Sequence, residues 1–155
     1  MNKIFSTLFL VLISSNLFAT DNRALIIEGT LNKSDNTPVT TSTSFTIQVR
    51  DTLGTCVMWE ETQTQTPVNG GIALQLGSGT IVYNGGGGTI DLIFKQGSAI
   101  NCKSSVPSAT ITPAINDDRN IAISFNDGTG AQSLSSQIPV KTVPWAMYTE
   151  NVSKI

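Results

Sequence analysis

Alternation of apolar and polar residues is the feature that most narrowly limits the fold of this chain. Apolar and polar residues alternate at 44–49, and the same alternation occurs at 56–61, 72–76 and 120–125. In the first of the four, the apolar side consists of Phe45, Ile47 and Val49. Successive side chains of a β-strand point to opposite faces, so this period indicates strands with one buried face. Before residue 143 no segment has the apolar period of an amphipathic helix, and the chain is therefore predicted to be all-β.

Turn signals separate the alternating segments. Runs rich in Gly, Asn, Asp and Pro occur at 32–38, 51–55, 69–71 and 126–130. Asn and Gly tolerate the positive φ that tight hairpin turns need. An apolar segment at 24–29 predicts one more strand ahead of the first turn. We therefore expect a single antiparallel β-sandwich of roughly seven to eight strands over residues 20–142.

A glycine run at 84–88 lies between two apolar segments, 81–83 and 90–94. A glycine-rich loop that cradles a phosphate is followed by Gly-Lys-Ser/Thr and a helix, and the sequence indicates neither. We therefore interpret the run as a connecting loop. Residues 97–118, rich in Ser, Pro and Asn, are predicted to be irregular.

The first 19 residues have the pattern of a secretory signal peptide. Lys3 precedes an apolar stretch at 4–13, and a small residue stands before a cut between Ala19 and Thr20. The apolar stretch is too short to span a bilayer, and the alternative is a buried N-terminal strand or helix. Cleavage leaves 136 of the 155 residues (155 − 19), enough for one domain. The mature chain is thus expected in the periplasm, on the outer cell surface or in the medium, with no membrane span.

Two cysteines, Cys56 and Cys102, remain in the mature chain. An even number of cysteines in an oxidising compartment favours a disulfide, and the alternative is two buried thiols on different strands. Without histidine, two lone cysteines cannot complete the four ligands of a zinc site. We predict neither a metal nor a cofactor.

Composition argues against several function classes. Only 13% of the residues are charged, the net charge is −2, and there is no histidine. A weakly acidic chain of this kind does not suit binding to nucleic acid or to anionic membranes. Without histidine there is no ordinary Ser-His-Asp relay, and the chain is predicted not to be an enzyme.

The remaining chemical candidates have simpler structural interpretations. Glu60 and Glu61 are neighbours on a predicted strand, so their carboxylates point to opposite faces and cannot flank one bond. Asp117-Asp118 and 126–128 lack the series of oxygen ligands found in calcium loops, and we expect turn or cap roles. Trp59 is expected in the core, with carbohydrate stacking as the alternative.

The C-terminal residues 143–155 show the only helical pattern. Pro144 suits the first turn of a helix. An apolar stripe then follows at i, i+4 and i+7, formed by Tyr148, Val152 and Ile155. These residues predict a short C-terminal helix, or the start of an oligomeric stalk in which the stripe forms the seam.

Four motifs follow one another along the chain. They are Ile-Glu-Gly-Thr-Leu at 27–31 with Asn-Thr-Pro-Val at 36–39, Phe-Thr-Ile-Gln-Val at 45–49 with Met-Trp-Glu-Glu-Thr at 58–62, Asn-Gly-Gly-Ile-Ala-Leu-Gln-Leu-Gly at 69–77, and 134–138 with Thr-Val-Pro-Trp-Ala-Met at 142–147. In this order they resemble the N-terminal β-sandwich module of bacterial exported fibre proteins of the phage-tail-fibre-like kind. The chain departs from the usual pattern at Asn36 for Gly, Ile72 for Phe and Trp145 for Tyr. The usual Pro-Arg pair is replaced by Ser136-Gln137.

The resemblance implies a non-enzymatic structural or interaction module. Such a module would form the base of a secreted or cell-surface trimeric fibre or adhesin, as a homo-oligomer or with a longer fibre protein. The alternative is a free-standing periplasmic or secreted β-sandwich that binds a glycan or a protein. The oligomeric state distinguishes the two, since a fibre base assembles and a lone binder stays monomeric.

Overall fold

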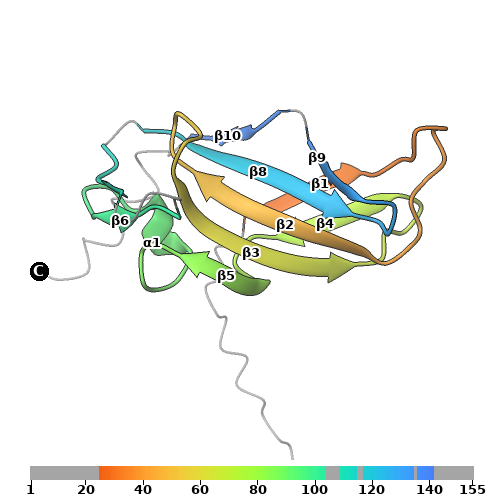
Figure 1. Ribbon diagram of the computed structural model, residues 1–155, viewed down its shortest axis with the longest axis horizontal. Coiled ribbons are helices and arrows are strands. Elements are labelled where there is room, and N and C mark those ends of the chain that lie inside the picture. Colours follow the sequence, from red (N-terminus) through yellow and green to blue (C-terminus); the bar gives the residue numbers. More distant parts are fainter. Residues whose placement is uncertain (1–24, 104–108, 115–116, 135, 142–155) are drawn as a thin grey trace, which may run out of the picture.

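The structure, a computed structural model, describes residues 25–103, 109–114, 117–134 and 136–141, and these form an all-β sandwich (Figure 1). The expectation of an all-β, antiparallel fold is confirmed. The strands are β1 (Ile26–Thr30), β2 (Thr43–Arg50), β3 (Val57–Gln65), β4 (Gly71–Gln75), β5 (Thr80–Asn84), β6 (Ile100–Asn101), β7 (Thr110–Ile111), β8 (Arg119–Asn126), β9 (Ala131–Ser133) and β10 (Ile138–Val140). One short helix, α1, covers Asp91–Phe94.

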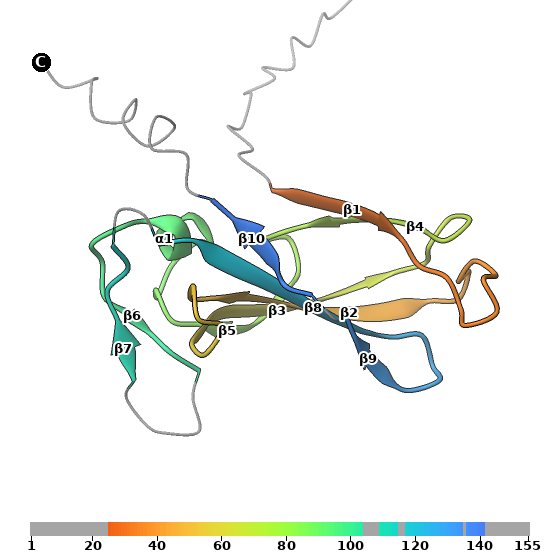
Figure 2. The same ribbon diagram turned by 90° about the horizontal axis from the view of Figure 1, so that it is seen from above.

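The larger layer is an antiparallel sheet in the order β10-β8-β2-β3-β5, with β9 pairing the other end of β8. Its central strand β2 pairs with β3 on one side and β8 on the other. The turn at 51–55 joins β2 to β3, as predicted. The smaller layer is the antiparallel pair β1-β4, which lies across one face of the large sheet (Figure 2).

The core lies between these two layers. The predicted inward side of β2 is completely buried, and its residues are Phe45, Ile47 and Val49. Cross-strand partners share a face of a sheet, so the register Ile47↔Ile123 places the apolar side of β8 on the same face. The smaller layer contributes Leu74 and Leu76 from above. Burial of these aliphatic side chains is the main stabilising contribution.

The turn at 69–71 carries the chain from the large sheet to the smaller layer. Val68 and Gly71 exchange both backbone hydrogen bonds, at 3.1 and 2.8 Å. Asn69 and Gly70, which lie between these two residues, have φ values of 51° and 80°. This is the conformation that an Asn-Gly pair favours in a tight turn. A Cβ on Gly70 would also lie 2.9 Å from the carbonyl oxygen of Leu31. The predicted turn is confirmed, although it connects two layers rather than two paired strands.

Strand β3 departs from simple alternation. Four consecutive residues are buried, Met58, Trp59, Glu60 and Glu61. On one face the segment after β4 lies over β3, where the Gly77 N–H donates to Glu61 at 2.9 Å. On the other face the Lys103 side chain forms an ion pair with Glu60. The register with β5 also shifts between Glu60 and Glu61, which marks a β-bulge.

Two local expectations differ from the structure. Residues 91–94 form a helical turn, where no helix was expected before residue 143. Its four residues are too few to produce a helical period, so pattern analysis missed it. The stretch 97–118 includes the two-residue strands β6 and β7, which are likewise too short to leave a sequence signal. The predicted C-terminal helix at 143–155 lies outside the described residues.

Candidate functional site

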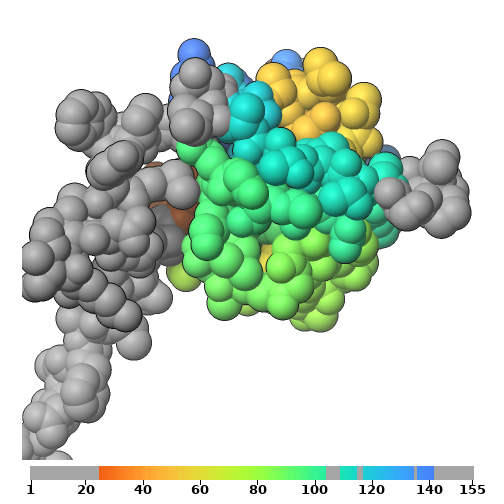
Figure 3. Space-filling model, turned by 90° about the vertical axis from the view of Figure 1, so that its left-hand side faces the viewer, coloured from red at the N-terminus to blue at the C-terminus, as the bar shows by residue number. Residues whose placement is uncertain are grey.

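A disulfide between Cys56 and Cys102 ties the β6 segment to the start of β3, confirming the predicted bridge. The two Cα atoms are 5.0 Å apart, and 46 positions separate the residues in the sequence. Figure 3 looks onto this end of the molecule, where residues near 85–103 in green lie against later ones in teal. The bridge therefore attaches the segment around Cys102 to the large sheet.

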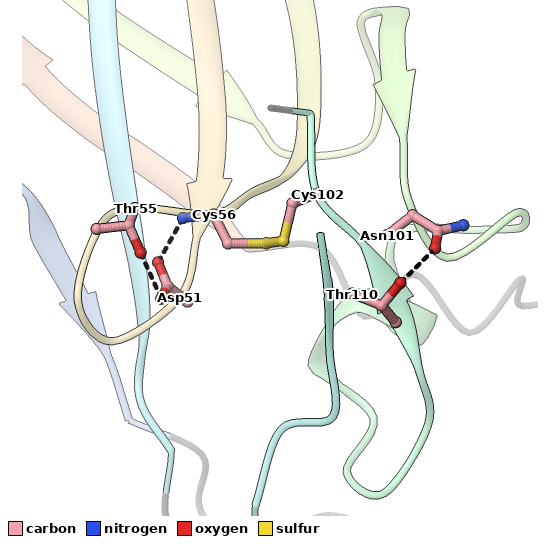
Figure 4. The surroundings of a disulfide bond; sticks show 6 residues. All are labelled: Asp51, Thr55, Cys56, Asn101, Cys102 and Thr110. Carbon is pink, nitrogen blue, oxygen red and sulfur yellow. Dashed lines mark hydrogen bonds between the residues drawn. A yellow bond between two sulfur atoms is a disulfide. The ribbon is translucent and has the colours of Figure 1, made fainter. Parts of the chain in front are cut away.

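Hydrogen bonds support both ends of the bridge (Figure 4). Asp51 accepts a hydrogen bond of 2.8 Å from the backbone N–H of Cys56 and one of 3.2 Å from the Thr55 hydroxyl. On the other side, Thr110 of β7 donates to the Asn101 side chain at 3.1 Å. The carboxylate thus closes the β2–β3 turn and places Cys56 for bonding.

The bridge positions Lys103 over the outer face of the large sheet, the face away from β1-β4. The backbone N–H of Lys103 donates to the Val57 carbonyl at 2.8 Å. Its Nζ atom makes an ion pair of 2.7 Å with Glu60 Oε1. Glu60 is nearly buried, with 8% of the residue exposed, so the lysine neutralises a carboxylate that would otherwise be costly.

Glu60 stays ionised because of these contacts. Burial raises the pKa of Glu60, but hydrogen bonds from Lys103 and Gln48 and the positive charges of Lys103 and Arg50 outweigh it. The net result is a pKa below the ordinary value. Gln48 Nε2 donates to Glu60 Oε2 at 2.7 Å, which leaves the Gln48 oxygen pointing to the other side.

That oxygen orients Arg50. Gln48 Oε1 accepts hydrogen bonds from Nε of Arg50 at 2.9 Å and from its Nη2. Nη1 of Arg50 makes a long contact of 3.4 Å to the carbonyl of Gly54. A continuous chain of contacts therefore runs from Lys103 through Glu60 and Gln48 to the guanidinium of Arg50.

Arg50 borders a shallow cleft of about 360 Å³ on the outer face. The floor comes from β2 and β8, and the wall comes from β9 and the connection to β10. The lining residues are Gln48, Arg50, Ala122, Ile123, Ser124, Ser133, Leu134 and Gln137. Amide, hydroxyl and guanidinium groups dominate this set, and it includes no aromatic side chain. Sequence analysis did not identify the cleft, because its walls come from segments far apart in the chain.

On the inner face, Glu61 is a buried acceptor. Its carboxylate accepts hydrogen bonds from Trp59 Nε1 at 2.9 Å, from Gln63 Nε2 at 2.7 Å and from the Gly77 N–H at 2.9 Å. Trp59 is 1% exposed, so the core interpretation is correct and the carbohydrate-stacking alternative is wrong. Glu60 and Glu61 lie on opposite faces, as the strand geometry predicted.

Arg119, at the start of β8, is a buried cation that sequence analysis missed. Its Nε donates to the Ile93 carbonyl at 3.0 Å and its Nη1 to the Asp117 carbonyl at 3.0 Å. Nη2 has no hydrogen-bond partner among the described residues. Burial lowers the pKa of Arg119, although Asp117 and Asp51 oppose this effect. One arginine before an alternating strand leaves no signal that it will be buried.

The remaining candidates have structural roles. Asn84 Oδ1 accepts hydrogen bonds from the N–H groups of Gly86 and Gly87, so the glycine run is a loop closed on its own side chain. Asp117 accepts from the Ala114 N–H at 2.8 Å, and Asp127 from the Thr129 N–H at 3.0 Å. These are the turn roles expected for the Asp117-Asp118 and 126–128 segments.

Several predicted site residues lie outside the described part of the chain. They are Ala19 and Thr20 of the cleavage site and Tyr148, Val152 and Ile155 of the proposed seam. Within the described ranges, no group of three or more His, Cys, Asp or Glu residues could hold a metal ion. The helix found in those ranges is too short to cross a membrane.

Comparisons with known proteins identify no relative: no family model, curated protein or solved structure matches this chain.

Proposed function

We propose that this chain is an exported, non-enzymatic assembly module that forms the base of a trimeric secreted or cell-surface fibre with a role in adhesion. The observation that carries the proposal is the open edge of β1. Leu76 N–H donates to the Leu25 carbonyl at 2.9 Å, so Leu25 and Ile27 direct their backbone groups toward β4. The backbone groups of Ile26 and Glu28 point the other way, where the structure describes no strand.

Three other sheet edges, those of β4, β10 and β5, are protected. The carbonyls of Ala73 and Gln75 on the free side of β4 accept hydrogen bonds of 2.6 and 2.8 Å from the Gln65 and Gln63 side chains. Strand β10 contains Pro139, which has no N–H to offer another strand. Strand β5 is irregular at its bulge. Proteins block sheet edges by such means, and an edge left regular favours pairing with another chain.

Exposed apolar residues accompany the open edge. Ile26 is 53% exposed and Leu25 is 38% exposed. A neighbouring copy that adds a strand beside β1 would bury these side chains and satisfy the backbone of Ile26 and Glu28. When the added strand comes from a segment other than β1, the contact joins two different surfaces, and three copies can close it into a ring. Tyr148, Val152 and Ile155, which lie outside the described residues, are the proposed seam of the same assembly.

A matched pair of substitutions tests this proposal. Ile26→Lys places a charge at the open edge, and Ile81→Lys makes the same change on β5, where the isoleucine is 52% exposed. In sedimentation velocity, Ile26→Lys should convert a trimer to monomers, whereas Ile81→Lys should leave the trimer intact. If both variants sedimented as the same species, the open edge of β1 would not be the assembly contact.

Export is the second part of the proposal. The chain is proposed to lose residues 1–19 and to reach the periplasm, the cell surface or the medium. The disulfide supports this assignment, because disulfides persist in oxidising compartments. The intact mass of protein from the cell envelope or medium should correspond to a chain starting at Thr20. A full-length chain in the cytoplasm would contradict it.

A free-standing glycan- or protein-binding sandwich is the second candidate. The cleft beside Arg50 favours it, because the cleft presents amide, hydroxyl and guanidinium groups on one face. The two candidates differ in mass, since a lone binder is a monomer. A monomer that binds a ligand in this cleft would replace the fibre proposal.

A further inference from the structure

Arg50 is a positive charge without a carboxylate partner among the described residues. The carboxylate nearest along its hydrogen-bond chain, Glu60, is separated from it by Gln48 and is paired with Lys103 at 2.7 Å. Glu60 and Lys103 neutralise each other, so the charge of Arg50 stays unbalanced beside the cleft. A half-buried guanidinium in this state attracts an anion.

The guanidinium is also fixed in orientation, with N–H groups left over. Of its five N–H groups, Gln48 and Gly54 engage three, so two remain (5 − 3). Gln48 occupies the edge formed by Nε and Nη2, so the N–H groups left over are one on Nη1 and one on Nη2. One N–H from each of these two nitrogens is the pair with which a guanidinium binds the two oxygens of a carboxylate.

The orientation of the Arg50 guanidinium depends on residues that do not contact it directly. Gln48 Nε2 is bonded to Glu60, so the Gln48 amide cannot turn over without losing that bond of 2.7 Å. Glu60 is held by Lys103, and Lys103 follows Cys102 of the disulfide directly. A binding group that is already oriented loses little entropy when a ligand arrives.

The rest of the cleft suits a sugar. Ser124 and Ser133 supply hydroxyls and Gln137 supplies an amide, while Leu134 offers a small apolar surface. Its volume of about 360 Å³ is near the lower limit for small-ligand sites, roughly 300–1,000 Å³. This size fits one or two sugar units better than a length of peptide, which would need a groove or a sheet edge.

We propose that the cleft bounded by β2, β8, Ser133, Leu134 and Gln137 binds a sugar that carries a carboxylate, such as a uronic acid unit of an acidic glycan, with Arg50 binding the carboxylate. Gln48 is the positioning residue, and Ser124, Ser133 and Gln137 bind sugar hydroxyls. The site goes beyond the assembly role, because it requires neither the open β1 edge nor a particular oligomeric state.

The test is calorimetric titration of the mature protein with a trimer of galacturonic acid. The matched ligand is the corresponding galactose trimer, which has CH₂OH in place of each carboxylate. We expect the acidic trimer to bind at least about tenfold more tightly, and added salt to weaken its binding. Heteronuclear NMR should show shifts of the side-chain amide signals of Gln48 and Gln137. Equal binding of the two trimers, or shifts elsewhere only, would overturn the proposal.

Two variants of Arg50 and one control assign the residue. Arg50→Gln should reduce affinity at least about tenfold, and Arg50→Lys should reduce it less, since lysine keeps the charge but loses the paired N–H groups. Lys33→Gln removes the same charge at an exposed turn and should change affinity less than about twofold. Loss of binding in the Lys33 variant to the same degree as in the Arg50 variants would indicate general charge attraction and reject the site.

Two further ligands separate other sources of the carboxylate. Sodium acetate supplies a carboxylate without a sugar, and a short poly-aspartate peptide supplies carboxylates on a polypeptide. Both should bind more weakly than the galacturonic acid trimer. If either binds as tightly, the assignment to an acidic sugar is wrong. None of these outcomes depends on the sedimentation result, so failure of this proposal and failure of the fibre proposal are distinguishable.

Discussion

The indole Nε1 of Trp59 donates a hydrogen bond of 2.9 Å to Glu61 Oε2 inside the sandwich. Both residues are essentially inaccessible to water. Glu61 also accepts from Gly77 and Gln63, so one carboxylate connects β3 to the end of β4. The bond from Gly77 joins the two layers, and the bond from Trp59 satisfies the buried indole within β3.

Replacement of this carboxylate by an amide should destabilise the fold. Glu61→Gln exchanges an acceptor oxygen for an NH₂ group that meets donors from Trp59 or Gly77, at a cost of about 2 kcal/mol in the free energy of unfolding. Urea unfolding followed by circular dichroism measures the change. Glu28→Gln makes the same exchange at an exposed position and should cost less than about 0.5 kcal/mol. Similar costs at both sites would contradict the role of Glu61.

Removal of the disulfide should have a larger effect. The bridge closes a segment of 46 residues, and the chain-entropy relation gives a loss of about 4 kcal/mol without it. Thermal unfolding of Cys56→Ala/Cys102→Ala should show a lower Tm, and the wild-type protein under reducing conditions should match it. Alkylation should label both cysteines only after reduction. Labelling of both in the native, unreduced protein would rule the bridge out.

Stability should fall at acid pH through Glu60. Its pKa is below the ordinary value of 4.5 in the folded chain, so the unfolded chain binds more protons between the two values. The stabilising contribution is complete above the ordinary value and is lost as the pH falls through the folded one. In urea unfolding across this range, Glu60→Gln should flatten the pH dependence, and Lys103→Gln should also reduce it. An unchanged slope in both variants would show that the ion pair does not contribute.

Gly85 should not accept a side chain. A Cβ at this position would overlap the carbonyl oxygen of Asn101, while the Gly85 N–H donates to Met58 at 2.9 Å. Gly85→Ala should cost about 3 kcal/mol or prevent folding, because backbone rather than a flexible side chain must move. Gly29→Ala on β1 serves as the control, since only Ile72 lies near its Cβ, at 3.9 Å. Equal stability of the two variants would argue against the close approach.

Local sequence patterns predicted much of the fold, but they did not predict the candidate site. The alternation around Ile47 predicted the buried face of β2, and the even cysteine count favoured the bridge. Asn36 has φ of 65°, a conformation that Asn tolerates, which agrees with the turn predicted at 32–38.

Contacts between distant segments explain what the sequence could not predict. The position of Arg50 beside the cleft depends on Gln48, Glu60 and Lys103, and Lys103 is brought there by the disulfide. The open edge of β1 depends on which strands pair, and alternation does not specify partners. Arg119 is buried through contacts with Ile93 and Asp117, which no local pattern encodes.

The mass of the assembled protein tests the central claim most directly. Sedimentation equilibrium of the mature chain, starting at Thr20, should give three times the mass of one chain. The double variant Val152→Asp/Ile155→Asp, which places charges in the predicted apolar seam, should reduce the measured mass to that of a single chain. A single-chain mass for the unaltered protein at high concentration, unchanged in the double variant, would contradict the fibre-base proposal.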